Sequence, residues 1–391
     1  MRNRWTVLAL LFFVRTTMAL QFQSVAAVAP LIGEQLTLGL SDIGLLIGLY
    51  FAPGGVLALP GGAFGRRVGD RIAVLVGLAL MLVGGAIVLL EPSWFGQIIG
   101  RLIAGTGGIL LNVLMTKMVA DWFAGHEIAT AMAVFINSWP CGIAVSLLVL
   151  PAIGATYGLF TVNVVVLSTV NLAALLFAGL YRNPASSAAS LAEGTMPDRD
   201  AVIAVLLAGG IWTAYNMGFA MVFSFGPAML SERGWSATAA GATISIVLWL
   251  TVLSVPLGGF LTDYLKRGDL ILTCACIAFA ALLAVISRND AVVPLVVVLG
   301  LLSGLPAGPI MSLPAQYLKP STRALGMGLF YTVFYIGMLI GPPAGGRYAN
   351  WAGGAAGAFH FGMFMLLLCP ILLAALRYTT QFRSNLIGRK I

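Results

Sequence analysis

Long apolar segments, each close to 20 residues, recur along the whole chain. A helix rises about 1.5 Å per residue, so about 20 residues cross the apolar core of a bilayer. The segments are continuous, unlike the short alternating strands of a transmembrane barrel. Breaking them at charges, prolines and glycine clusters predicts twelve transmembrane helices, over residues 6–31, 42–64, 72–90, 95–119, 128–151, 158–181, 201–230, 237–262, 270–288, 292–317, 324–347 and 353–376.

The composition supports this interpretation and excludes several classes of protein. Of the 391 residues, 60% are hydrophobic and only 9% are charged, against about 25% in a soluble domain. The mean hydropathy is +1.00. Too few charges are present to solvate a globule of this size, which excludes a cytosolic enzyme, a secreted disulfide scaffold and a disordered chain. The net charge of +8 is assigned to cytoplasmic loops and not to nucleic-acid binding.

The distribution of basic residues predicts the topology. If the N-terminus is cytoplasmic, the inner loops and tails hold 16 Lys and Arg and the outer loops hold three, while Arg15 and Arg101 fall within the membrane. This asymmetry predicts a multi-pass protein of the inner or plasma membrane with both termini cytoplasmic. The longest polar stretch, 183–200, predicts a cytoplasmic linker. It separates a six-helix bundle at 1–182 from a second bundle and a short cytoplasmic tail at 201–391.

The two halves resemble each other in sequence. Shifting the chain by 196 residues places Leu59-Pro60-x-Gly62-x-Phe64 on Val255-Pro256-x-Gly258-x-Phe260, and a shift of 195 aligns segments of the predicted fifth and eleventh helices. The fold class predicted is therefore an all-α membrane protein with twelve transmembrane helices in two pseudo-repeated bundles. Such repeats are typical of transporters, whose binding site lies near the bilayer midplane.

The loop motifs resemble those of the major facilitator superfamily. The loop at 62–71 is similar to the signature G-x-L-A-D-R-x-G-R-K/R, and 259–267 is similar to its second copy. The fourth segment carries the family's R-x-x-x-G-x-G element, beginning at Arg101. The resemblance covers essentially the whole chain. It implies a transporter that works by alternating access and needs no cofactor.

The resemblance also implies a cytoplasmic latch. It assigns gating or conformational roles to eight residues, namely Arg66, Arg67, Asp70, Arg71, Arg101, Asp263, Lys266 and Arg267. The first copy departs from the family pattern because Arg66 stands where an Asp is usual. A weakened first latch, or one that uses Asp70 and Asp121, is therefore expected. The alternative is that the basic residues of this loop only fix the topology.

Buried charge points to the substrate class. All thirteen acidic residues fall in loops or at helix ends, which disfavours a cation carrier and proton symport through a core carboxylate. Arg15 lies about ten residues into the first segment and keeps its charge at any accessible pH. An anionic substrate is its natural counter-ion. The alternatives are that backbone carbonyls, Gln21 or Asn112 satisfy Arg15, or that it snorkels.

A narrower resemblance and several polar side chains extend this hypothesis. The buried Arg15 and the Asn112-Val113-Leu114 element are similar to the cyanate- and nitrate-porter branch of the family, which implies anion transport. Residues of the fifth, seventh and eleventh segments are predicted to line the cavity, although aromatic stripes are also typical of helix packing. The predicted substrate-binding residues are Arg15, Asn112, Asn137, Trp139, Trp212, Tyr215, Asn216, Tyr331 and Tyr335.

The sequence thus predicts a monomeric transporter of a small anion, by facilitated or secondary active transport, whose partners are that solute and the lipid bilayer. No nucleotide, metal-ligand or nucleophile motif is found, so neither catalysis nor a metal or cofactor is expected. Two alternatives stay open: an exporter of lipophilic drugs or metabolites, in which Arg15 is structural, and a membrane sensor that transports nothing.

Overall fold

The computed structural model describes residues 3–57, 67–123, 127–182, 196–319 and 321–387, which form helices and no strand. Within these residues, eleven helical segments are long and apolar enough to cross a membrane. One of them, Thr130–Leu180, has 51 residues, or about 77 Å of helix, enough for two crossings. Gly158 interrupts it with a φ of 79°, a left-handed conformation that glycine adopts without strain. The prediction of an all-helical membrane fold is confirmed.

The first half of the chain forms the N-terminal helices. Their bounds are α1 Arg4–Ala27, α2 Ala29–Leu36, α3 Leu40–Leu49, α4 Gly54–Leu57, α6 Asp70–Leu90, α7 Trp94–Trp122, α8 Ile128–Ile136 and α9 Ser138–Leu180. The second half forms the C-terminal helices. Their bounds are α10 Arg199–Glu232, α11 Ala237–Leu265, α12 Gly268–Ile286, α13 Val292–Ser303, α14 Ala307–Ser312, the 3₁₀ turn Pro314–Gln316, α15 Arg323–Trp351 and α16 Ala356–Ile387.

Four predicted helices are interrupted in the structure. The first is divided at Val28, just before Pro30, and the second breaks between Leu49 and Gly54. The fifth is divided at Asn137, and the tenth is divided into α13, α14 and a 3₁₀ turn. Proline lacks an N–H group and disfavours helical geometry in the residue before it, which favours such breaks. Other prolines, such as Pro151 and Pro256, lie inside unbroken helices. Sequence alone therefore did not decide where a proline would end a helix.

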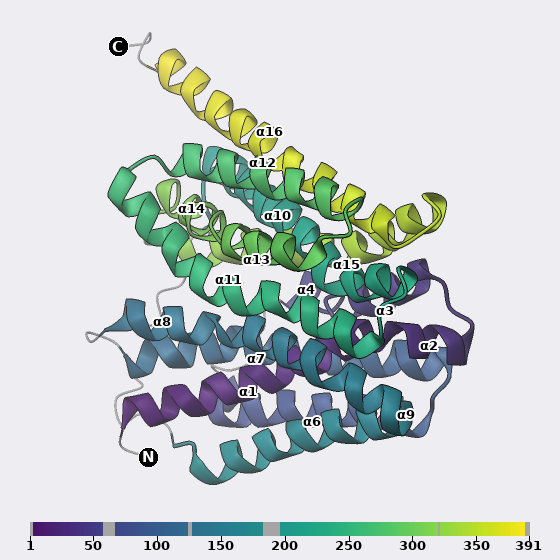
Figure 1. The fold of residues 1–391 in the computed structure, drawn as a ribbon. Helices are drawn as coiled ribbons and strands as arrows, with labels where there is room; N and C mark the ends of the chain where they lie inside the picture. Colours follow the sequence, from purple (N-terminus) through teal and green to yellow (C-terminus); the bar gives the residue numbers. More distant parts are fainter. Residues whose placement is uncertain (1–2, 58–66, 124–126, 183–195, 320, 388–391) are drawn as a thin grey trace.

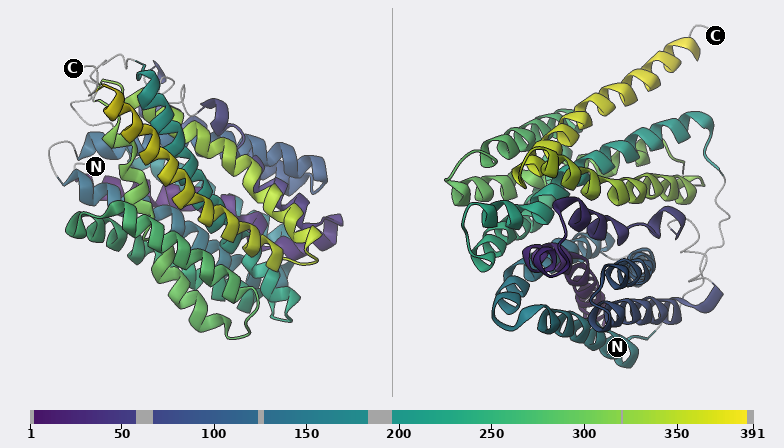
Figure 2. Two further views of the ribbon diagram at one scale, coloured as in Figure 1. Left: turned by 90° about the horizontal axis from the view of Figure 1, so that it is seen from above. Right: turned by 90° about the vertical axis from the view of Figure 1, so that its right-hand side faces the viewer.

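The N-terminal helices lie together on one side of the molecule and the C-terminal helices on the other (Figures 1 and 2). We call the end that holds the start of α1 and the end of α11 the terminal end. The opposite end holds α2 and the turn between α15 and α16. The predicted linker at 183–200 falls mostly outside the described residues, and the predicted domain boundaries stay predictions.

Glycines bring the two groups of helices into backbone contact near the opposite end. A Cβ atom added at Gly44 or Gly48 of α3 would collide with the carbonyl of Pro342 or Leu339 of α15. One added at Gly346 of α15 would collide with the carbonyl of Leu40. Small residues allow this close approach of helices in a membrane. The seam between α3 and α15 therefore holds the two groups of helices together near the opposite end.

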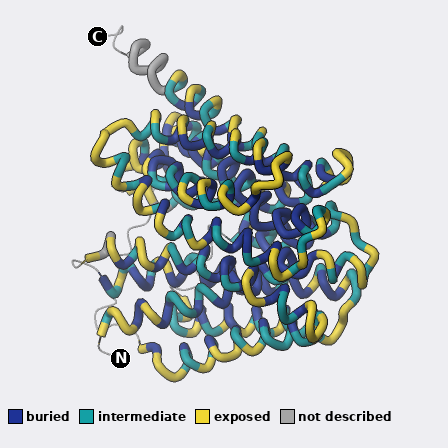
Figure 3. Tube along the Cα trace, in the orientation of Figure 1, coloured by how far each residue is buried: buried dark blue, intermediate teal, exposed yellow. Residues whose placement is uncertain are grey.

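Burial is greatest where the two groups of helices meet (Figure 3). Buried aromatic side chains of this region include Phe22, Tyr50 and Phe330, each with at most 2% of its surface exposed. The outer surface instead displays large apolar side chains such as Phe95 and Ile371. Exposed apolar side chains in such number are typical of a surface that faces lipid.

Candidate functional site

Arg15 lies near the middle of α1, eleven residues or about 17 Å beyond its first residue. Its Nη1 donates to the carbonyl oxygens of Phe135 at 3.1 Å and Ile136 at 3.4 Å. The guanidinium carbon lies 4.7 Å from the centre of the Phe135 ring. These carbonyls belong to the last turn of α8, where a helix leaves carbonyls without an intrahelical partner. The interruption at Asn137 therefore creates the polar surface that receives Arg15.

Two of the alternatives for Arg15 differ from the structure. Gln21 donates to the carbonyl of Met81 and Asn112 donates to Tyr335, so neither amide is bonded to Arg15. The Nε of Arg15 is buried and has no hydrogen-bond partner. Buried polar groups rarely stay unpaired, because the lost hydration is then not replaced. Backbone carbonyls therefore bind the Nη1 side of the guanidinium, while its Nε remains available to another hydrogen-bond acceptor.

The charge of Arg15 has no carboxylate partner among the described residues. Their ion pairs join Arg4 to Glu127, Lys117 to Asp70 and Asp121, and Arg377 to Asp269. Tyr331 and Tyr335 of α15 lie near the guanidinium. The structure therefore brings Arg15 together with both predicted tyrosines, while its positive charge stays uncompensated.

Two asparagines bridge the N-terminal and C-terminal helices near this site. The Nδ2 of Asn112 donates to the Tyr335 hydroxyl at 3.0 Å, and the Nδ2 of Asn137 donates to the carbonyl of Val252 at 3.3 Å. The Oδ1 atoms of both asparagines are buried without partners. Because these oxygens accept hydrogen bonds, a hydroxyl-bearing molecule would satisfy them.

Aromatic rings from both halves of the chain surround Tyr335. Its ring centre lies 5.2 Å from Phe334, 6.2 Å from Phe51 and 6.5 Å from Tyr331. Trp212 of α10 lies 6.2 Å from Phe334, and its indole Nε1 is buried without a partner. We name Phe51, Trp212, Tyr331, Phe334 and Tyr335 the aromatic cluster. Trp139 reaches its edge, 6.4 Å from Phe51, and stacks on Phe22.

Sequence reasoning missed three residues of this region. Phe51 and Phe334 belong to the aromatic cluster, and Phe334 directly precedes the predicted Tyr335. Gln23 is 1% exposed, donates to the carbonyl of Phe223 at 2.7 Å, and leaves its Oε1 unpartnered. An amide two turns beyond Arg15 in an apolar helix was the signal that could have identified it.

Tyr215 and Asn216 bond elsewhere. The Tyr215 hydroxyl donates to the carbonyl of Ser303 at 2.7 Å, within the C-terminal helices, and the residue is 3% exposed. Asn216 donates to the carbonyl of Trp212 on its own helix. The predicted binding residues of the seventh segment therefore lie in different surroundings. The indole of Trp212 joins the aromatic cluster, whereas the hydroxyl of Tyr215 bonds within the core of the C-terminal helices.

Arg101 has a different environment from Arg15. It is 3% exposed, and its three nitrogens donate to the carbonyls of Leu46, Gln21 and Phe22 at 3.0, 2.9 and 2.7 Å. The guanidinium also lies 4.9 Å from the centre of the Tyr50 ring. Arg101 thus connects α7 to α1 and α3, and each of its nitrogens has a partner within the protein.

Apart from Arg101, the predicted gating residues that the structure describes lie at the terminal end. Lys117 pairs with Asp70 at 2.6 Å and with Asp121 at 3.3 Å. Arg71 donates to the carbonyl of Ala178 at 2.6 Å, and Arg67 is exposed. Arg66 lies outside the described residues.

The second motif borders an open cavity of about 570 Å³ at the same end. Asp263, Lys266 and Arg267 line this cavity beside Asp269 and Arg377, which form a salt bridge of 2.7 Å. The two copies of the motif therefore have different surroundings. The first has a partly buried acid paired with a lysine, and the second has an open, charged surface.

Comparison with known proteins identifies the family. The sequence model of the Major Facilitator Superfamily matches this chain twice, over residues 11–214 and 207–388. The chain belongs to the Major Facilitator Superfamily. It is therefore an integral multi-pass membrane protein and a transporter, not an enzyme. That the same family model matches each half agrees with the internal repeat in the sequence.

Several curated relatives are also similar to this superfamily transporter. A hexuronate transporter of Bacillus subtilis (strain 168) is 23% identical over 280 residues, which are 68% of this chain and 66% of that protein. A protein of Escherichia coli (strain K12) named "Probable L-galactonate transporter" is 27% identical over 157 residues, or 40% and 35% of the two chains. The inner membrane transport protein YajR of the same organism is 29% identical over 133 residues, or 34% and 29%. The chain thus spans about two thirds of the first relative and about a third of the others.

Proposed function

We propose that this transporter moves a small organic anion, and that Arg15 binds the anionic group. The observation that carries the proposal is the state of the Arg15 guanidinium. It lies halfway along α1, has a buried and unpartnered Nε, and has no carboxylate partner among the described residues. A buried cation in a membrane is costly, and a planar guanidinium binds carboxylates through two parallel hydrogen bonds.

The remaining polar atoms favour an anion that also carries hydroxyl groups. The unpartnered Oδ1 atoms of Asn112 and Asn137 need hydrogen-bond donors, and the Trp212 indole needs an acceptor. Hydroxyl groups supply both. Two relatives are named as transporters of hexuronate and of L-galactonate, names that agree with such a solute. We therefore propose a hydroxylated carboxylate as substrate.

We further propose a mechanism of alternating access between two six-helix bundles, with both termini cytoplasmic. The close backbone contact of α3 and α15 near the opposite end supports a conformation whose site is reached from the terminal end. Transport then requires the glycine contacts of this seam to separate while the terminal end closes, a rocking motion around a central site. The Asn112–Tyr335 hydrogen bond links the two moving parts at the site itself.

A second candidate is the export of lipophilic compounds. The observation in its favour is the aromatic cluster, which offers a large apolar contact surface between the two groups of helices. In that case the carbonyls of Phe135 and Ile136 would be the only partners that Arg15 requires. The two candidates differ in what an Arg15 substitution does.

The test is uptake into proteoliposomes with a panel of hydroxylated carboxylates and lipophilic dyes. We expect flux of at least one carboxylate, reduced by at least about 100-fold in Arg15→Ala, because a hydrogen-bonded charge pair is lost. Arg15→Lys should retain only a small part of the wild-type carboxylate flux, because an ammonium group cannot form the two parallel hydrogen bonds of a guanidinium. Carboxylate flux that is unchanged in Arg15→Ala would refute the proposal, and dye flux alone would favour the lipophilic exporter.

A further inference from the structure

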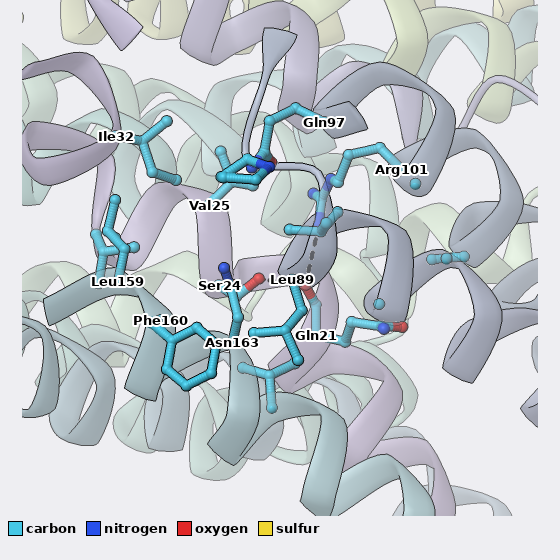
Figure 4. Close-up of a pocket in the computed structure, with 18 of the residues that line it drawn as sticks. Gln21, Ser24, Val25, Ile32, Leu89, Gln97, Arg101, Leu159, Phe160 and Asn163 are labelled. Carbon is cyan, nitrogen blue, oxygen red and sulfur yellow. Dashed lines mark hydrogen bonds between the residues drawn. The ribbon is translucent and has the colours of Figure 1, made fainter. Parts of the chain in front are cut away.

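A cavity of about 200 Å³ lies wholly within the N-terminal helices, toward the opposite end (Figure 4). It is lined by side chains of α1, α2, α6, α7 and α9, and by none of the C-terminal helices. The site proposed for the substrate uses residues of both halves of the chain. This cavity is therefore a separate feature, which the transport mechanism does not explain.

Two buried hydrogen-bond acceptors in the cavity wall lack a partner among the described residues. Gln21 and Gln97 are 4% and 5% exposed, and the Oε1 atom of each is buried without a partner. The amide orientation of Gln21 is fixed, because its Nε2 already donates to the carbonyl of Met81 at 2.9 Å. The Ser24 hydroxyl donates to the carbonyl of Gln21, which leaves its oxygen free to accept. A molecule that fits must therefore bring hydrogen-bond donors.

The charge around the cavity narrows the chemistry further. Arg101 lies in the wall, and among the described residues no carboxylate lines the cavity. The positive charge of Arg101 disfavours an ammonium group. Its nitrogens already donate to the carbonyls of Leu46, Gln21 and Phe22, so they offer little to an anion. Uncharged hydroxyl groups can donate to the unpartnered oxygens. They are not repelled by Arg101 as an ammonium would be, and they need no free guanidinium donor as an anion would.

Much of the remaining wall is apolar, apart from Gln35 and Asn163, and it reaches the outer surface. Val25, Leu89 and Leu159 line the cavity, and Phe160 beside them is 68% exposed (Figure 4). Phe160 follows the kink at Gly158 and lies on the apolar exterior of the N-terminal helices. An apolar cavity of this size stays empty, but one with unpaired amides binds polar molecules. The shape suits a compact hydroxylated group bound at the edge of the membrane.

We propose that this cavity binds a glycerol-like group, a compact unit with neighbouring hydroxyls, supplied either as a free polyol or as the headgroup of phosphatidylglycerol. The hydroxyls donate to the Oε1 atoms of Gln97 and Gln21, and the carbon skeleton packs on the apolar wall. Bound in this way, the group joins α1 to α7 beside the contacts of Arg101. It needs no opening of the seam between α3 and α15.

The experiment measures binding to the purified, delipidated full chain. Free glycerol is titrated by saturation-transfer NMR, and retention of phosphatidylglycerol is compared with that of phosphatidylcholine by native mass spectrometry. We expect saturable binding in at least one arm. Gln97→Leu should weaken it by about 5- to 10-fold, since one hydrogen bond is lost. Ser24→Ile should abolish it by filling the cavity. Glycerol binding indicates a free polyol, and selective retention of phosphatidylglycerol alone indicates the lipid.

Two controls make the outcome decisive. Gln23→Leu removes an amide that is equally buried and also has an unpartnered Oε1, but that does not line the cavity, so binding should be unchanged. Arg15→Ala should also bind normally, which separates this inference from the proposed substrate site. Size-exclusion chromatography confirms the fold of each variant, and Ser24→Ile serves if Gln97→Leu does not fold. Absence of saturable binding in both arms, or equal binding by wild type and both cavity variants, would overturn the proposal.

Discussion

The amide of Asn112 in α7 donates a hydrogen bond of 3.0 Å to the hydroxyl of Tyr335 in α15, 223 residues later in the chain. The bond joins the two groups of helices, and Tyr335 also lies near Arg15. We therefore expect this hydrogen bond to depend both on substrate binding and on the relative arrangement of the two groups of helices.

Removing either partner of this bond should weaken substrate binding. Tyr335→Phe and Asn112→Leu are each expected to raise the apparent affinity constant KM by about 3- to 10-fold, since a net hydrogen bond contributes about 1 kcal/mol. The loss of binding free energy in the double variant should be smaller than the sum of the losses in the two single variants, because residues in direct contact are energetically coupled. Transport kinetics of the four proteins test this, and additive effects would show that the bond does not couple the residues.

Arg101→Ala should lower stability far more than it alters substrate recognition. The substitution removes hydrogen bonds to the carbonyls of Leu46, Gln21 and Phe22 and leaves a buried gap, a loss of about 3 kcal/mol. Thermal unfolding in detergent should therefore shift downward by several degrees. Arg15→Ala is the matched control, with the opposite pattern: little change in unfolding and a large loss of anion binding. If Arg101→Ala unfolds like wild type but no longer binds, the structural assignment is wrong.

Holding the opposite end closed should stop transport. A Cβ atom at Gly39 would lie 3.4 Å from the Asn350 Nδ2, so cysteines at these positions are close enough for a short bifunctional thiol reagent. Gly39→Cys combined with Asn350→Cys should lose nearly all flux when cross-linked and recover it when a cleavable linker is reduced. Each single variant treated with the reagent is the control. Full flux in the cross-linked protein would exclude separation of this seam.

The two partners of Lys117 should contribute unequally. Asp70 has a side chain only 15% exposed and lies 2.6 Å from the lysine, whereas Asp121 is 36% exposed, 3.3 Å away and one helical turn along. Asp70→Asn should destabilise the protein by about 1–2 kcal/mol, and Asp121→Asn by about 0.3–0.5 kcal/mol, because exposed pairs are screened by solvent. Thermal unfolding of both variants measures the difference. Equal effects would mean that burial does not strengthen the Asp70 pair.

Much of this protein was readable from its sequence. The length and composition of the apolar segments determined a helical membrane fold, because backbone groups in lipid must bond within their own helix. The half-chain repeat and the loop motifs indicated the family. The position of Arg15 in an apolar segment without acids marked it as exceptional before any contact was known, because burying an unpaired charge is costly.

Tertiary structure alone decided how the two arginines within the membrane-spanning helices differ. Both stand in apolar helices, yet Arg101 has a carbonyl partner for every nitrogen, and Arg15 keeps an unpartnered Nε beside Tyr331 and Tyr335. The carbonyls that receive Arg15 come from the end of α8 at Ile136, a helix end that the apolar pattern did not reveal. Likewise, Tyr215 bonds to Ser303 while Phe51 joins the aromatic cluster. Hydrophobic periodicity determines which segments enter the membrane, but the direction of each polar atom depends on breaks and close approaches of helices distant in sequence.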